Sequence, residues 1–232
     1  MGLIEILLGK KKPEFTERIW FTTELKIADL VNQVQAGQEH SDSSVVVAHF
    51  PATQRSLLAA LANRGVNCRV IANLNEFSSI APTQLPQKTA LVLTADALPD
   101  FGMRAVNPQP KNMALAPVSI HLAEHYPGID RDQRVLALDK LWPMRLNFTC
   151  YMGLDEPWLA LLGIDRIRAM LLQLGVDQES VLEPARHGRA IQTLGCAIQS
   201  AQKRLAQQVP HARDCDSCVE WVQINLTGSR GL

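Results

Sequence analysis

The sequence lacks a net charge. Lys and Arg together number 23, and so do Asp and Glu, which gives a formal charge of +0 at pH 7. Without an overall positive field, the chain has no long-range attraction for the phosphates of nucleic acid or for an anionic membrane. We therefore expect no nucleic-acid partner.

Long apolar runs are also absent. A membrane-spanning helix needs about 18 or more consecutive apolar residues, and no stretch of the sequence reaches that length. The opening, MGLIEILLGKKKPEF, does not have the pattern of a secretory leader. These absences predict a cytoplasmic protein. The aliphatic residues and lysines of the opening could place a short helix on an acidic bilayer, but we favour packing on the fold because so short a helix binds membranes weakly.

The short motifs that mark many nucleotide and metal enzymes are missing as well. The sequence has no GxxxxGK followed by Ser or Thr, no GxGxxG, no HExxH and no GxSxG. The first of these supplies the backbone cradle and the lysine for nucleotide phosphates, and the others mark dinucleotide, zinc and serine-nucleophile sites. We therefore predict no cofactor, no catalytic residue and no enzymatic activity of the isolated chain.

Disulfides are not expected, because the five cysteines are an odd number in a chain without a secretion signal. Cys68 and Cys150 lie in apolar, strand-like contexts and are predicted to be small core residues. In the tail, His211, Cys215 and Cys218 have a spacing that could supply three ligands to a tetrahedral zinc ion. No fourth ligand is evident, and a single CxxC is a weak signal, so we favour a polar tail without metal.

What the sequence does contain is an alternation of strand and helix patterns up to about residue 153. Runs such as SSVVVA are typical of buried parallel strands, and the segments between them have apolar residues at helical spacing. This alternation predicts an α/β fold with a mostly parallel sheet flanked by helices. The expected strands are 18–22, 43–50, 67–72, 89–95, 118–125 and 145–153, the last of them at an edge of the sheet.

From residue 155 onward the pattern is helical almost throughout. The longest expected helix covers about 178–209 and would extend on the order of 40 Å, so we expect part of it to project and to meet a protein partner or a second copy of the chain. Its apolar seam consists of Ile191, Leu194, Ile198, Ala201 and Leu205. The chain thus divides into an N-terminal segment at 1–16, an α/β domain at 17–153, a helical extension at 154–209 and a tail at 210–232.

A candidate ligand pocket lies where the expected strands end, because open α/β sheets bind ligands at the carboxyl edge. The segment HLAEHYP also has the HxxEH spacing of some zinc proteases, but it follows a strand instead of lying on a helix, so its side chains cannot share one face. Glu124, Asp130 and Asp132 could act as an acid cluster, but solvated loop carboxylates are far commoner than catalytic ones, so we favour that interpretation. The candidate pocket residues are Thr94, Asp96, Asp100, His121, Glu124, Arg131 and Arg134.

The C-terminal region resembles a known family. FTCYMGLDEPWLALLGIDRIRAMLLQLGVDQESVLEP, continued by AIQSAQKRL, is similar to the end of the second nucleotide-binding domain and the start of the scaffold helix of SecA, the preprotein translocase motor. Looser similarity extends over about 17–207. The resemblance implies a RecA-like domain with a helical extension and a link to protein translocation. The matching positions are Phe148, Tyr151, Leu154, Asp155, Gly163, Asp165, Arg166, Ile167, Met170, Leu174, Gly175 and Glu183.

Two nucleotide-contacting segments of that family are changed in this chain. Where the family has ATNMAGRGTDI, this sequence has LTADALPDFGM, which keeps Thr94 but loses the glycines and the arginine. Where the family has LRGRSGRQGD, this sequence has RVLALDKLW, and Leu136 and Leu138 cannot donate to phosphate oxygens. The family's first motor domain, with its phosphate loop, has no counterpart here. These departures imply that the site no longer holds a nucleotide.

Two functional hypotheses follow. The first is a non-catalytic, SecA-like single RecA-like domain that acts as a protein-interaction or regulatory module through its C-terminal helix. The alternative is half of a composite ATPase, in which the chain contributes to nucleotide binding or hydrolysis on a separate motor subunit. In that case Arg131, Arg134 and Lys140 are the cations that would face the partner's nucleotide.

Overall fold

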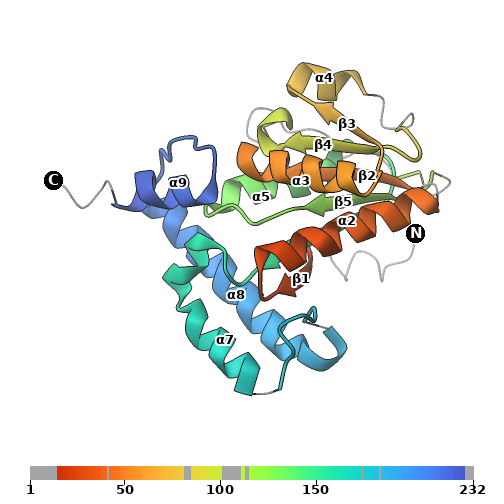
Figure 1. Ribbon diagram of the computed structural model, residues 1–232. Coiled ribbons are helices and arrows are strands. Elements are labelled where there is room, and N and C mark those ends of the chain that lie inside the picture. Colours follow the sequence, from red (N-terminus) through yellow and green to blue (C-terminus); the bar gives the residue numbers. More distant parts are fainter. Residues whose placement is uncertain are drawn as a thin grey trace, which may run out of the picture.

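A six-stranded, all-parallel sheet forms the centre of the protein, with the strand order β1-β6-β5-β2-β4-β3 (Figure 1). The computed structural model describes residues 15–40, 42–80, 85–100, 111–112, 115–173, 175–182 and 184–227. The expected α/β fold with a helical C-terminal part is confirmed. The strands are β1 (Thr16–Trp20), β2 (Ser43–Ala48), β3 (Cys68–Ile71), β4 (Ala90–Thr94), β5 (Val118–Leu122) and β6 (Leu146–Gly153).

Helices cover both faces of the sheet, which explains why the inner strands are apolar on both sides. Alternate residues of one strand point to opposite faces: Val46 packs under α2 and α3, whereas Val45 and Val47 pack toward the other face. The first face carries α2 (Thr23–Glu39) and α3 (Pro51–Asn63). The opposite face carries α4 (Leu74–Ser79), α5 (Ile129–Leu136) and α6 (Leu138–Leu141).

The boundaries of α2 and α3 follow from local chemistry. Thr22 is the N-cap of α2, and its hydroxyl accepts a hydrogen bond from the backbone N–H of Leu25. Pro51 occupies the first turn of α3, where its missing N–H is tolerated. Beyond the last turn, Gly65 adopts φ 68°, a left-handed conformation that favours glycine. Because Thr22 starts the helix, β1 runs over Thr16–Trp20 instead of the expected 18–22.

The prediction that the strand at 145–153 lies at an edge is wrong. Strand β6 is internal and pairs with β1 on one side and β5 on the other, and its last residues are buried. The edge position belongs to β1, which pairs with β6 across more than a hundred residues of sequence. Periodicity along the chain reports burial of a strand but not which strand lies beside it.

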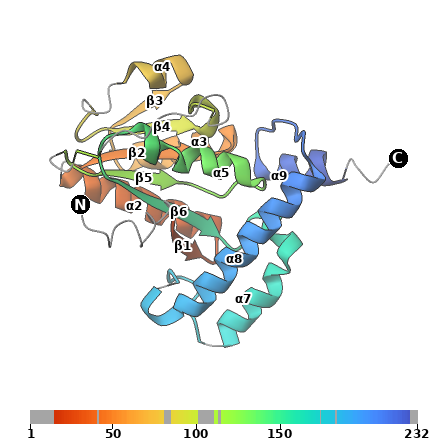
Figure 2. The same ribbon diagram turned by 180° about the vertical axis from the view of Figure 1, so that it is seen from behind.

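The helical part after β6 shares a hydrophobic core with the sheet. Leu194 and Ile198, from the predicted seam, pack with Ile19 of β1, Met152 of β6 and Trp158. In Figure 2, α8 passes across the β1 end of the sheet and leads toward α9. The apolar seam of α8 is therefore covered by residues of the same chain. The elements are η3 (Pro157–Leu162), α7 (Ile164–Gln173), α8 (Pro184–Gln208, kinked at His187), α9 (Cys218–Val222) and η4 (Gln223–Thr227).

A buried ion pair joins the end of β6 to the start of α2. Lys26 Nζ lies 2.6 Å from Glu156 Oε1, and both side chains are almost fully buried. The same carboxylate oxygen accepts the N–H of Gly153 at 3.0 Å. Burial disfavours the charge on Lys26, but the opposed charges of Glu156 and Glu124 raise its pKa above the ordinary value. The pair fixes the position of the helical extension relative to α2.

 The N-terminal segment, for which contact with a bilayer was the alternative to packing on the fold, lies outside the described residues up to residue 14. Among the described residues, no helix is long and apolar enough to cross a membrane.

We predict that Gly153→Ala destabilises the protein by about 1–3 kcal/mol. A Cβ atom at this position would lie 2.6 Å from Asp155 Oδ1 and 2.8 Å from the backbone nitrogen of Thr23, so the junction between β6 and α2 would have to open. Denaturant unfolding measures the change. The matched control is Gly195→Ala in α8, where a Cβ meets no atom within 4 Å; this variant should gain about 0.5–1 kcal/mol. Equal stability of the two variants would contradict the close approach at Gly153.

Candidate functional site

The candidate site lies at the carboxyl edge of the sheet, between the ends of β2 and β5. After β2 the chain builds β3 and β4 on one side of that strand, and it then crosses to the other side to form β5. Such a reversal creates a crevice in which open α/β sheets bind ligands. His49 and Phe50 follow β2 and lead into α3, while Glu124 and His125 follow β5.

The N-terminus of α3, a position that attracts phosphate groups in many α/β proteins, is occupied by the carboxylate of Glu124. Its Oε1 accepts the backbone N–H groups of His49 at 3.0 Å and Phe50 at 3.2 Å. Its Oε2 accepts the hydroxyl of Thr53 at 2.6 Å. Glu124 is buried, so an internal anion satisfies the donors that would otherwise face a ligand.

A second buried carboxylate, Asp132 of α5, holds the two sides of the crevice together. Its Oδ1 lies 2.7 Å from His49 Nε2 and accepts the N–H of Tyr126 at 3.0 Å. Its Oδ2 lies 2.6 Å from His125 Nδ1 and accepts Gln202 Nε2 of α8 at 2.6 Å. Burial opposes the charge on Asp132, but His125 and the hydrogen bonds from both histidines hold its pKa well below the usual value.

His125, which lies between the carboxylates of Asp132 and Glu17, is held in its charged form. Burial disfavours the charge on His125, but the nearby groups Cys150, Glu17 and Asp132 raise its pKa well above the ordinary value. Its Nδ1 faces Asp132, and its Nε2 lies 3.1 Å from Glu17 Oε2. His125 therefore connects the crevice to β1.

Residues 211–227, which we call the C-terminal cover, lie over this edge. Trp221 is buried and packs with Phe50 and Tyr126, and its Nε1 donates to the Tyr126 hydroxyl at 2.8 Å. The carbonyl of Asp216 accepts the backbone N–H of Ala52 at 2.9 Å. The cover thus takes one of the free N–H groups in the first turn of α3 and closes the crevice from outside.

Four of the sequence-predicted pocket residues do come together. Arg131 forms ion pairs with Asp96, at 3.0 Å, and with Asp214 of the C-terminal cover. Arg134 pairs with Asp100, and its Nη1 also donates to the carbonyl of Ala95 at 3.3 Å. In addition, the Arg131 guanidinium lies 4.5 Å from the centroid of the Tyr126 ring. These contacts engage both arginines within the protein.

The remaining predicted pocket residues lie elsewhere. Thr94 ends β4 without capping the following turn, and Glu124 binds α3 as described above. His121 does not join the arginines, because the alternation of β5 turns it to the α2 face, where its Nδ1 lies 3.0 Å from the Tyr151 hydroxyl. His121, Glu124 and His125 of HLAEHYP thus have different partners from one another, as their placement on a strand end predicts.

The tail residues proposed as weak zinc ligands do not form a metal-binding group. Among the described residues, the group of His, Cys, Asp and Glu side chains close enough to hold an ion is Glu17, His125 and Cys150. Cys215 Sγ lies 3.3 Å from the carbonyl of Arg213. Burial raises the pKa of Cys218 to about 12, so its thiol stays protonated.

The sequence reasoning missed the two groups that organise the site. Asp132 resembled a solvated loop carboxylate, and Gln202 lay on what was expected to be a projecting helix. Both are buried. The sequence did contain one signal for Asp132. It lies only a few residues after HLAEHYP, in the segment that connects β5 to the next strand of the sheet.

No protein-family model matches the chain, and no curated protein sequence matches it. Among solved structures, the chain is similar to the C-terminal domain of a possible DNA helicase from Lactobacillus plantarum WCFS1, with 17% identity, 68% of this chain and 85% of that chain covered, and a TM-score of 0.37. A likeness this distant supports no functional argument, and nothing in the comparisons points to SecA.

We predict that replacement of His121 removes part of the acid sensitivity of the fold. Burial lowers the pKa of folded His121 to about 4, against about 6.5 in an unfolded chain. The unfolded state therefore gains a proton first as the pH falls, and stability present above pH 6.5 is lost toward pH 4. Between pH 7 and pH 5 this loss is about 2 kcal/mol.

Denaturant unfolding at the two pH values tests this prediction. His121→Gln should lose about 2 kcal/mol less than the native protein on acidification. His211→Gln, at an exposed position of the C-terminal cover, should behave like the native protein. An unchanged pH dependence in His121→Gln would contradict the assignment of a neutral, buried imidazole.

Proposed function

We propose that this protein is a RecA-like module that does not hydrolyse nucleotides and that acts by binding another protein. The observation that carries the proposal is the position of Glu124, whose carboxylate occupies the donors at the N-terminus of α3. A nucleotide phosphate placed there would meet a buried negative charge at the point where it needs positive ones. The occupied crevice therefore supports a role without nucleotide.

Two further features support a binding role. The C-terminal cover pairs with Ala52 and Arg131 at the carboxyl edge, and Arg134 pairs with Asp100 there. Most of the exposed large apolar side chains of the described residues lie instead in the helical part after β6, where a partner would find them. These are Leu161, Met170, Leu172, Val219 and Ile224. The resemblance to SecA makes protein translocation the process in which we would look for such a partner.

Calorimetric titration of the full chain with ATP and ADP in the presence of magnesium tests the proposal. We expect no heat of binding up to millimolar nucleotide and no phosphate release. Glu124→Gln serves as a companion variant, because it removes the charge and keeps the shape of the side chain. Saturable binding of nucleotide to the native protein would refute the proposal.

One observation favours the composite ATPase as a second candidate. Arg131 and Arg134 lie about one helical turn apart on α5, and Asp96, Asp100 and Asp214 are mostly exposed acids. The acids lie on the solvent side of the two mostly buried arginines, so a bound partner would bring nucleotide phosphates to the arginines by displacing these acids.

The test of this candidate is the ATPase rate of the SecA motor from the same organism, measured with and without saturating amounts of this protein. A composite site predicts a changed rate that returns to the basal value with Arg131→Gln/Arg134→Gln. Arg69→Gln, at a distant exposed ion pair on β3, is the matched control. A rate that the native protein leaves unchanged would remove this candidate.

A further inference from the structure

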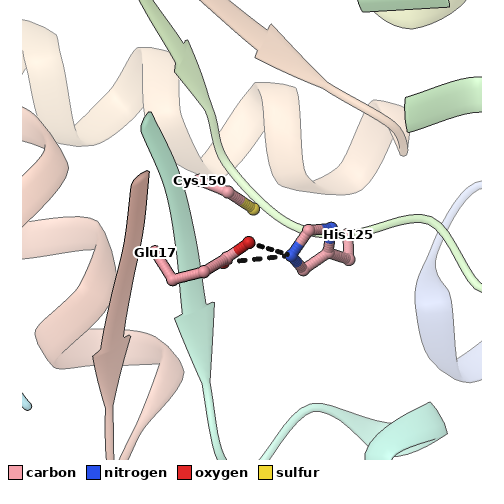
Figure 3. A group of neighbouring side chains, drawn as sticks. All are labelled: Glu17, His125 and Cys150. Atoms are coloured by element: carbon pink, nitrogen blue, oxygen red, sulfur yellow. Dashed lines mark hydrogen bonds and ion pairs between the residues drawn. The ribbon is translucent and has the colours of Figure 1, made fainter. Parts of the chain in front are cut away.

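Three side chains of different chemistry meet beside the crevice, under the β1 end of the sheet. Glu17 of β1 and Cys150 of β6 are register partners on adjacent parallel strands, so their side chains point to the same face. His125 approaches them from the loop after β5 (Figure 3). One ligand atom from each of the three lies within 4.8 Å of the others.

The geometry is close to that of a metal centre. Zinc binds sulfur at about 2.3 Å and nitrogen or oxygen at about 2.0–2.2 Å in a tetrahedron, which places the ligand atoms of such a set about 3.3–3.7 Å apart. His125 Nε2 already lies 3.1 Å from Glu17 Oε2. The thiol of Cys150 points toward the same space (Figure 3), and a shift of about 1 Å would bring all three to bonding positions.

The histidine is also oriented as a metal ligand needs. Metal-bound histidines generally donate their other ring N–H to a carboxylate, which fixes the tautomer and the ring plane. Here His125 Nδ1 lies 2.6 Å from Asp132 Oδ2, so Nε2 is the nitrogen turned toward Glu17 and Cys150. Asp132 itself is held by three other groups, which makes this support rigid.

A fourth position opens to a cleft. Glu17, His125 and Asp132 line a cavity of about 680 Å³ between the start of β1, α5 and α8. Phe15 packs edge-on against both His125 and Phe148 and shields one side of the cluster. A water molecule or an external ligand can reach an ion there from the cleft, whereas Cys150 stays buried behind it.

We propose that Glu17, His125 and Cys150 form a site for one zinc ion, with water from the cleft as the fourth ligand. The mixed thiolate, imidazole and carboxylate set suits Zn²⁺ better than the hard cations Mg²⁺ or Ca²⁺, which take oxygen ligands. On binding, Cys150 Sγ and His125 Nε2 each release a proton to solvent, and the two anionic ligands balance the charge of the ion.

Titration of the metal-free full chain with Co²⁺ tests the site, because this ion occupies zinc positions and reports its ligands by absorption. We expect one equivalent to bind, with the visible bands of tetrahedral cobalt and a thiolate-to-cobalt charge-transfer band in the near ultraviolet. Zn²⁺ should displace the cobalt and abolish both. A native protein that shows neither band would overturn the proposal.

Variants assign the ligands. Cys150→Ser should lose the charge-transfer band. Loss of a partner behind a metal ligand lowers affinity by about 10- to 100-fold, so loss of a direct ligand in Glu17→Gln should weaken Co²⁺ binding at least about tenfold. Glu17 is partly exposed. The test with Glu17→Gln therefore does not depend on a substitution in the core, as the test with Cys150→Ser does.

Two controls separate this site from other thiols. Cys196→Ser changes an exposed cysteine on the wall of the same cleft, and Cys215→Ser/Cys218→Ser removes both thiols of the C-terminal cover. Each should bind Co²⁺ with the native spectrum. Loss of the charge-transfer band in either control, or its survival in Cys150→Ser, would overturn the assignment.

Discussion

The buried carboxylate of Asp132 is the group on which the arrangement of the carboxyl edge depends. A carboxylate out of water requires several hydrogen bonds, and Asp132 receives them from the ends of two strands and from α8. These partners hold α5, the loop after β5 and α8 in one position. Removal of any one of them leaves a buried polar group with an unmet bond, which costs about 1–3 kcal/mol.

How far the sequence predicts this fold depends on the range over which each signal acts. The run at Val45–Val47 and the glycine after α3 act within a few residues, and both predicted their elements well. The pairing of β1 with β6 and the burial of Asp132 depend on residues far apart in the chain. Local propensity cannot report such contacts, because tertiary packing decides them.

The residues of the candidate site were likewise predicted correctly only where local signals were enough. Asp96, Asp100, Arg131 and Arg134 were expected at the carboxyl edge and lie there as ion pairs. His121 was expected with them, but it lies on the opposite face because a single-residue step along a strand reverses the side chain. Glu124 was a candidate ligand residue, and it turns out to take the position where a ligand would bind. Position in a fold thus does not determine function.

The contacts of α8 and the C-terminal cover with the carboxyl edge form late during synthesis of the chain. During synthesis, all six strands leave the ribosome before Gln202 can reach Asp132 or Trp221 can reach Tyr126, since these contacts span 70 and 95 residues. Until then the nascent sheet exposes Phe50 and Tyr126 at an unfinished edge. Without the cover these two rings lack their contacts with Trp221, so this apolar cluster is complete only when residues 211–227 are in place.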